Sequence, residues 1–329
     1  MRKNLKHFHE KFCNINFERN AKNSLKIATR GSQLAIWQAE WVKMMILRYH
    51  PEIEVELVIL KTVGDKILDK SLSKIGGKGL FIKELEIAIL ERKADIAVHS
   101  MKDVTSFLPE GLEISVIAKR EAAGDAWICP KFGGIEKFPK GGVVGTSSLR
   151  RQSQLKYYRP DLRFQLLRGN VQTRLRKLEE GIVQATILAE AGLKRINLKD
   201  RITEVLPIEI ILPAIGQGAI GIETRVGDED TLNIIKHIND KTTWDCLVAE
   251  RSLLKVFEGN CQIPLSGYCI PREDKLFLRA AIGDLEGEKL VRYEELSNRK
   301  NAKKLGEKVA HYLLKNGAEE ILKKLKTII

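Results

Sequence analysis

Basic residues recur beside serine, threonine and glycine at four points of the sequence, a combination suited to binding carboxylates or phosphates. An arginine fork grips both oxygens of a carboxylate, and hydroxyl groups and helix N-termini add donors for anions. One such arginine alone is most simply a solvated surface charge, but four similar segments indicate a site for several acid groups. The segments are Thr29-Arg30-Gly31-Ser32, His99-Ser100-Met101-Lys102-Asp103, Gly145-Thr146-Ser147-Ser148-Leu149-Arg150-Arg151 and Leu167-Arg168-Gly169-Asn170-Val171-Gln172-Thr173-Arg174.

Asp103 is an acidic residue among these basic segments. A carboxylate in such a place stabilises a cationic intermediate and shuttles protons; the alternative is a helix cap or a salt bridge to Lys102. None of the segments has the spacing of a phosphate-binding P-loop or of a dinucleotide fingerprint, and Gly76-Gly77-Lys78-Gly79 also lacks a preceding strand.

Short apolar runs must position these segments. They predict strands at 25–29, 53–60, 96–99, 114–118, 127–129, 143–145, 164–167, 185–188 and 220–223, and helices at 32–49, after 79, 147–157, 171–181 and 189–196. Strands that alternate with helices predict an α/β fold with parallel-rich sheets, whose ligands bind at the carboxyl ends of the strands.

The pattern changes near residue 231. A helix at 244–257, strands at 267–270, 276–282 and 289–296, and a final helix at 303–315 predict a small α+β unit. The strand at 220–223 is expected to return to the first unit. The predicted organisation is a basic, disordered extension (1–23), a first lobe (24–119 with 219–236), a second lobe (120–218) and a third domain (237–329).

The overall composition limits the kinds of molecule that the protein is expected to bind. The chain has 329 residues and a net charge of +13, which favours anions in general. The basic segments carry no interleaved aromatic residues, which argues against a nucleic-acid binder, and no apolar run approaches the roughly 20 residues that span a membrane. Five cysteines without a CxxC pair argue against a metal site and for a reducing compartment. We expect a cytoplasmic protein, with organelle import through the basic extension left open.

Longer stretches resemble the porphobilinogen deaminase family. VHSMKDV, GTSSLRRQ, LRGNVQTRL and PAIGQGA stand in the family's order, and the similarity extends from about Leu25 to the C-terminal helix. The resemblance implies two lobes like those of periplasmic binding proteins, an active site in the cleft between them, and a small C-terminal α+β domain. It also implies a monomeric transferase of heme biosynthesis that joins four porphobilinogen molecules head-to-tail into hydroxymethylbilane on a covalent dipyrromethane cofactor.

The resemblance further implies roles for particular residues. Asp103 matches the catalytic carboxylate, and Cys261 matches the cysteine that holds the cofactor through a thioether. Cofactor contacts match Ser100, Lys102, Thr146, Ser148, Arg150, Arg151 and Gln217. Substrate contacts match Arg30, Ser32, Lys78, Arg168, Asn170, Arg174 and Arg195. The sequence departs from the family pattern at Thr105, where a proline often stands, and at 119–124, which differs from the usual acidic hinge. A two-lobed anion-binding protein without catalysis is the alternative, and it would need neither Asp103 nor Cys261.

Overall fold

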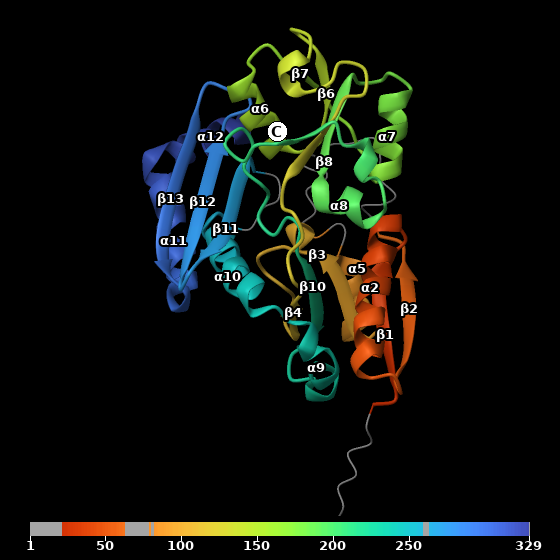
Figure 1. The fold of residues 1–329 in the computed structure, drawn as a ribbon. Helices are drawn as coiled ribbons and strands as arrows, with labels where there is room; N and C mark the ends of the chain where they lie inside the picture. Colours follow the sequence, from red (N-terminus) through yellow and green to blue (C-terminus); the bar gives the residue numbers. More distant parts are fainter. Residues whose placement is uncertain (1–21, 63–78, 80–81, 259–262, 329) are drawn as a thin grey trace, which may run out of the picture.

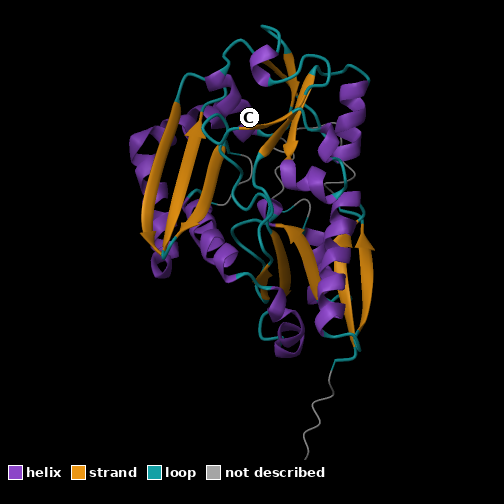
Figure 2. Ribbon diagram, in the orientation of Figure 1, coloured by secondary structure: helices purple, strands orange, loops and turns teal. Residues whose placement is uncertain are grey.

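The computed structural model describes residues 22–62, 79, 82–258 and 263–328, which form three sheets with their covering helices (Figures 1 and 2). The first sheet, with its helices, is called lobe 1 and has the strand order β2-β1-β3-β10-β4. Its elements are β1 (Ser24–Arg30), α2 (Gln33–Tyr49), β2 (Glu54–Leu60), α5 (Lys83–Leu90), β3 (Ile96–Ser100), β4 (Leu112–Ile117), β10 (Ile220–Arg225) and α9 (Glu229–Ile235).

Helix α2 shows why these residues form these elements. Ser32 is its N-cap and accepts a hydrogen bond from the Ala35 N–H at 3.3 Å. Ala39, Val42 and Ile46 then recur at three- and four-residue spacing and are fully buried, so one face of the helix packs into the apolar core over β1.

The second sheet, with its helices, is called lobe 2 and has the order β7-β6-β8-β5-β9. Its core surrounds Trp127, which is fully buried and donates its indole N–H to the Gly133 carbonyl at 3.0 Å. The elements are β5 (Asp125–Ile128), β6 (Val143–Gly145), α6 (Leu149–Tyr158), β7 (Arg163–Gln165), α7 (Val171–Glu179), β8 (Ala185–Ala189), α8 (Glu190–Arg195) and β9 (Glu204–Leu206).

The third sheet, β11-β12-β13, is antiparallel throughout, and with helices packed on one face it forms the C-terminal domain (Figure 2). The sequence predicted one final helix, but the chain turns at Gly317 (φ 119°) and continues as a second helix. The elements are α10 (Lys241–Val256), β11 (Leu265–Arg272), β12 (Lys275–Gly283), β13 (Leu290–Asn298), α11 (Ala302–Leu313) and α12 (Glu319–Ile328).

Two crossing segments, 119–124 and 213–219, join the lobes and run side by side. The Glu121 N–H donates to the Gly218 carbonyl at 3.2 Å, and the Gln217 side chain donates to the Ala123 carbonyl at 2.6 Å. The second segment leads into β10, which pairs with β3 and β4. This strand thus returns to lobe 1, as the sequence predicted.

The prediction of parallel-rich sheets holds for four of the five strands of each lobe, but one strand in each lobe runs in the opposite direction. In lobe 1, β10 is antiparallel to both neighbours, and in lobe 2 so is β5. Both strands follow a crossing segment, so each begins at the edge of its sheet where the lobes meet. The other strands of the sheet run toward that edge, so β5 and β10 run in the opposite direction. In the part of the chain that the structure describes, no helix is long and apolar enough to cross a membrane.

Candidate active site

The residues predicted around Asp103 lie where β3 ends against the second crossing segment. A short 3-10 turn, Met101–Asp103, follows Ser100, and with the next two residues it forms what we call the 101–105 loop. The Met101 N–H donates to the Ala219 carbonyl at 3.0 Å. Gly216 has φ 73°, and a Cβ there would lie 2.8 Å from the Met101 carbonyl carbon. The loop is therefore seated directly on backbone that only glycine allows.

Asp103 interacts electrostatically with a cation of each lobe, Lys102 and Arg174. Burial lowers the pKa of Lys102 to about 8; Asp103 and Asp125 oppose this shift, whereas Arg151 and Arg174 add to it. Burial likewise lowers the pKa of Arg174 to about 10, with Arg151 and Arg168 adding and Asp103 opposing. Positive charge in this cluster thus exceeds the negative charge that the chain supplies locally, so an anionic ligand would be favoured here.

Arg150 and Arg151 lie in the first turn of α6 and are buried against Asp125, the first residue of β5. Arg150 Nη2 lies 2.8 Å from Asp125 Oδ2, and Arg151 Nε and Nη2 donate to Oδ1 at 2.9 and 2.6 Å. Burial alone would raise the pKa of Asp125, but the two arginines together lower it below its ordinary value. Their remaining donors reach the carbonyls of Leu212 and Ile187. The two predicted cofactor-binding arginines are thus held by a carboxylate that the sequence analysis missed.

Several predicted polar residues are helix caps. Ser148 accepts from the Arg151 N–H at 3.4 Å to begin α6, and Asn170 accepts from the Thr173 N–H at 2.9 Å to begin α7. Thr146 Oγ1 accepts from the Ser148 N–H at 3.1 Å. These contacts fix the turns from which Arg150, Arg151 and Arg174 extend.

Ser100, Gln217 and Arg195 connect parts of the site to one another. Ser100 is hydrogen-bonded to Gln38 of α2 at 2.9 Å. Gln217 donates to Asp125 Oδ1 at 3.2 Å, while its buried Oε1 has no hydrogen-bond partner among the residues that the structure describes.

Arg195 joins lobe 2 to lobe 1. Its Nη2 donates to the Gly218 carbonyl at 2.7 Å, and its guanidinium lies 5.8 Å from the ring centre of Trp37 on α2. Burial lowers the pKa of Arg195 to about 10, and the nearby carboxylate of Glu121 opposes this shift.

The remaining predicted residues are placed as follows. Arg30 and Ser32 lie at the carboxyl end of β1 and the start of α2. Arg168 is buried, which lowers its pKa, and it adds to the cationic surroundings of Arg174. Lys78 and Cys261 lie outside the described residues.

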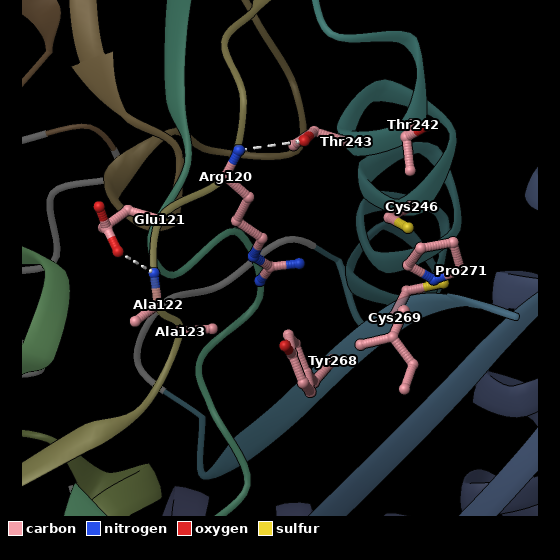
Figure 3. A pocket seen from close by; sticks show the side chains of 11 residues that line it. Arg120, Glu121, Ala122, Ala123, Thr242, Thr243, Cys246, Tyr268, Cys269 and Pro271 are labelled. Atoms are coloured by element: carbon pink, nitrogen blue, oxygen red, sulfur yellow. Dashed lines mark hydrogen bonds between the residues drawn. The ribbon is translucent and has the colours of Figure 1, made fainter.

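Sequence reasoning also missed Arg120 and Glu250, which meet where the crossing segments touch the C-terminal domain. Arg120 Nη1 lies 2.5 Å from Glu250 Oε1, and its backbone N–H donates to Thr243 (Figure 3). A cavity of about 270 Å³ lies beside this pair, between the first crossing segment, α10 and β11. Tyr268 and Cys246 are among the residues that line it, and none of the predicted site residues that the structure describes does.

Two α/β lobes joined by two crossing segments, with a cationic cluster where they meet, define a two-lobed protein built to hold an anionic small molecule. Similar solved structures include the periplasmic VFT2 domain of Bordetella pertussis BvgS, at 14% identity over 66% of this chain and 86% of that chain, with a TM-score of 0.42. The aliphatic sulphonate binding protein SsuA of Escherichia coli has 11% identity over 72% and 71%, with a TM-score of 0.39. A Salmonella typhimurium periplasmic binding protein has 12% identity over 68% and 94%, with a TM-score of 0.39.

Family comparison decides which kind of protein this is. Residues 25–233 match the dipyrromethane cofactor binding domain of porphobilinogen deaminase, and residues 244–315 match the C-terminal domain of the same enzyme. The chain belongs to the porphobilinogen deaminase family. It is a transferase of tetrapyrrole biosynthesis that uses a dipyrromethane cofactor and joins four porphobilinogen molecules into hydroxymethylbilane. The predicted family, fold class, activity and cofactor are confirmed, and the non-catalytic alternative is set aside.

Proposed function

We propose that Asp103 is the catalytic carboxylate of this hydroxymethylbilane synthase and that Cys261 carries the cofactor. The observation that supports the first assignment is the position of Asp103, an acid whose charge acts on Lys102 of its own loop and on Arg174 of the opposite lobe. A carboxylate at this position is well placed to stabilise positive charge that develops between the lobes.

Asp103 acts on the substrate in two ways in this proposal. Loss of ammonia from the aminomethyl group leaves a positively charged pyrrole ring, which the carboxylate stabilises through the ring nitrogen. After the new carbon–carbon bond forms, the ring carbon gives up its proton, and Asp103 assists that transfer. When bound, the dipyrromethane supplies the pyrrole carbon to which the first substrate is joined.

The residues of the cluster fit this cofactor, which bears acetate and propionate groups. Lys102 and Arg174 have lowered pKa values because they are buried near other cations, and carboxylates would offset that repulsion. We assign Ser100, Lys102, Thr146, Ser148, Arg150, Arg151 and Gln217 to holding the cofactor. We assign Arg30, Ser32, Lys78, Arg168, Asn170, Arg174 and Arg195 to holding substrate and the growing chain.

The same proposal extends to the organisation of the chain. Residues 24–119 with 219–236, 120–218 and 237–329 are proposed as its three domains, in keeping with the membership of the three sheets. A monomer in the cytoplasm stays a prediction.

Replacing Asp103 tests the catalytic assignment. Asp103→Asn keeps the shape of the side chain and removes its charge, so we expect a folded, cofactor-loaded protein whose turnover falls about 10²- to 10⁴-fold. Intact mass gives the cofactor content, and hydroxymethylbilane formation gives the rate. Asp200→Asn, at an exposed aspartate, is the control and should leave the rate unchanged. A near-normal rate for Asp103→Asn removes Asp103 from the mechanism.

Replacing Cys261 tests the attachment site. Cys261→Ser should lack the mass of the two linked pyrrole rings, because a hydroxyl does not replace the thiol in a thioether. Cys13→Ser should retain that mass. If Cys261→Ser still carries the covalent cofactor, the assignment is wrong.

A further inference from the structure

One face of α10 supports the 101–105 loop. Leu247, Glu250 and Arg251 lie on this face at i, i+3 and i+4. Leu247 is fully buried and packs with Met101 and Val104 in one apolar cluster. The C-terminal domain therefore meets the loop through side chains of this helix.

Glu250 fixes this helix to the crossing segments. Its fully buried carboxylate accepts from the Gly216 N–H through Oε2 and from the Cys269 N–H through Oε1, both at 2.8 Å, besides pairing with Arg120. Gly216 is the residue on which the loop is seated. The position of α10 is thus set relative to the backbone beneath the loop.

Arg251 contacts the loop itself. Its Nη2 donates to the Thr105 carbonyl at 2.8 Å and its Nη1 to the Val104 carbonyl at 3.3 Å. These are the first two carbonyls after Asp103. A planar guanidinium reaches two successive carbonyls with two donors, which the single ammonium of a lysine does less well. One turn further along α10, the Lys255 ammonium lies 5.4 Å from the ring centre of Phe107.

We infer that Arg251 is a positioning residue for Asp103: it holds the backbone that follows the carboxylate, so that Asp103 keeps its place when the lobes move relative to each other. The inference rests on the proposed role of Asp103. Along the sequence, α10 ends at Val256, five residues before Cys261. The same helix thus holds the loop of the catalytic acid and leads to the proposed attachment residue.

The test is Arg251→Met in the cofactor-loaded enzyme. The change keeps a long apolar stem and removes both hydrogen bonds. We expect kcat to fall about 10- to 100-fold, because small misplacements of a reacting group have effects of this size, while KM for porphobilinogen changes much less. Amide hydrogen exchange should rise in peptides covering 101–108 and stay unchanged in lobe 2. Intact mass should show the cofactor still attached.

Two further variants separate positioning from general stability. Arg251→Lys keeps the charge and should recover part of the lost kcat. Arg279→Met removes an arginine of the same domain that pairs with Glu209 of lobe 2 and with Glu294 of β13, and it should change neither kcat nor the exchange of 101–108.

Three outcomes overturn the inference. They are a normal kcat for Arg251→Met, a parallel change of kcat and KM with faster exchange throughout the protein, or an Arg251→Lys variant no better than Arg251→Met. If Arg251→Met does not fold, Arg251→Lys decides, because a normal kcat and normal loop exchange in that variant contradict the two-carbonyl role. Loss of turnover in Asp103→Asn with a normal rate in Arg251→Met would refute only this inference, whereas a normal rate in Asp103→Asn would refute the proposed function itself.

Discussion

Asp125 is the residue whose replacement should affect the stability of lobe 2 most directly. It is fully buried, and both of its oxygens face guanidinium groups that are about as buried, at 2.6 to 2.9 Å. At an effective dielectric of about 20, each unit-charge pair at roughly 4 Å contributes about 4 kcal/mol, and desolvation of the three groups offsets part of this. Removing one partner from such a cluster typically costs about 3–5 kcal/mol.

Asp125→Asn should therefore lower the free energy of unfolding by about 3–5 kcal/mol at pH 7. Urea unfolding of proteins with the same cofactor content by intact mass measures it. Asp161→Asn is the matched control, since that aspartate pairs with Arg159 at 2.7 Å in the same lobe but is about 20% exposed, and its loss should cost about 1 kcal/mol.

The pH dependence of the stability contributed by Asp125, and its dependence on Arg150, give two further checks. The folded pKa of Asp125 is depressed, so the stabilisation is complete above the unfolded value of about 3.9 and is lost as pH falls through the lower folded value. Adding Arg150→Leu to Asp125→Asn should cost less than the sum of the two single changes. If Asp125→Asn costs no more than Asp161→Asn, the buried charge cluster does not stabilise the lobe as argued.

Two other positions give predictions of different kinds. Gly216→Ala should lower turnover about 10- to 100-fold, because its Cβ would lie within 3 Å of Met101; Gly227→Ala, with a similar φ of 75° and open space around it, should leave the rate unchanged, and equal rates for the two variants would contradict the seating of the loop. Burial, with Glu223 as the second cause, raises the pKa of Glu86 to about 7, so its contribution to stability is complete below its unfolded value of about 4.3 and is lost as pH rises through 7. Thermal unfolding should therefore show a smaller loss of stability between pH 5 and 8 for Glu86→Gln than for the wild type, and identical slopes would show that Glu86 does not titrate there.

Much of the fold could be predicted because its signals are local. Ser32, placed before a run of apolar residues at helical spacing, identified the start of α2. Strand direction has no such signal: β5 and β10 read as ordinary apolar runs, and their antiparallel pairing depends on where the chain re-enters each sheet. The second C-terminal helix was missed although Ile321 and Leu325 are buried at helical spacing, because the predicted final helix ended at 315, before the break at Gly317.

The site, like the fold, has a part that the sequence predicted and a part that it did not. The basic segments could be recognised in the sequence because the same combination of residues occurs four times. In the structure, Lys102, Asp103, Arg151 and Arg174 lie close enough to interact electrostatically. Asp125 and Glu250 carry no local sign of importance, since each is one acidic residue in an ordinary strand or helix. Their partners lie far away in the sequence: Asp125 pairs with Arg151, and Glu250 with Arg120. Only the folded chain shows that these acids organise the arginines.

The position of β10 has a consequence for how the protein is made. Within the described sheet of lobe 1, β4 (Leu112–Ile117) pairs with β10 and with no other strand, yet about a hundred residues of lobe 2 are synthesised between them. When β4 has emerged from the ribosome, its partner strand β10 has not yet been synthesised. The sheet of lobe 1 therefore keeps an unpaired edge until β10 emerges. Lobe 2, which is built from continuous sequence, is free to fold first, and a chain stopped before Ile220 should aggregate through the open edge rather than accumulate as a folded half.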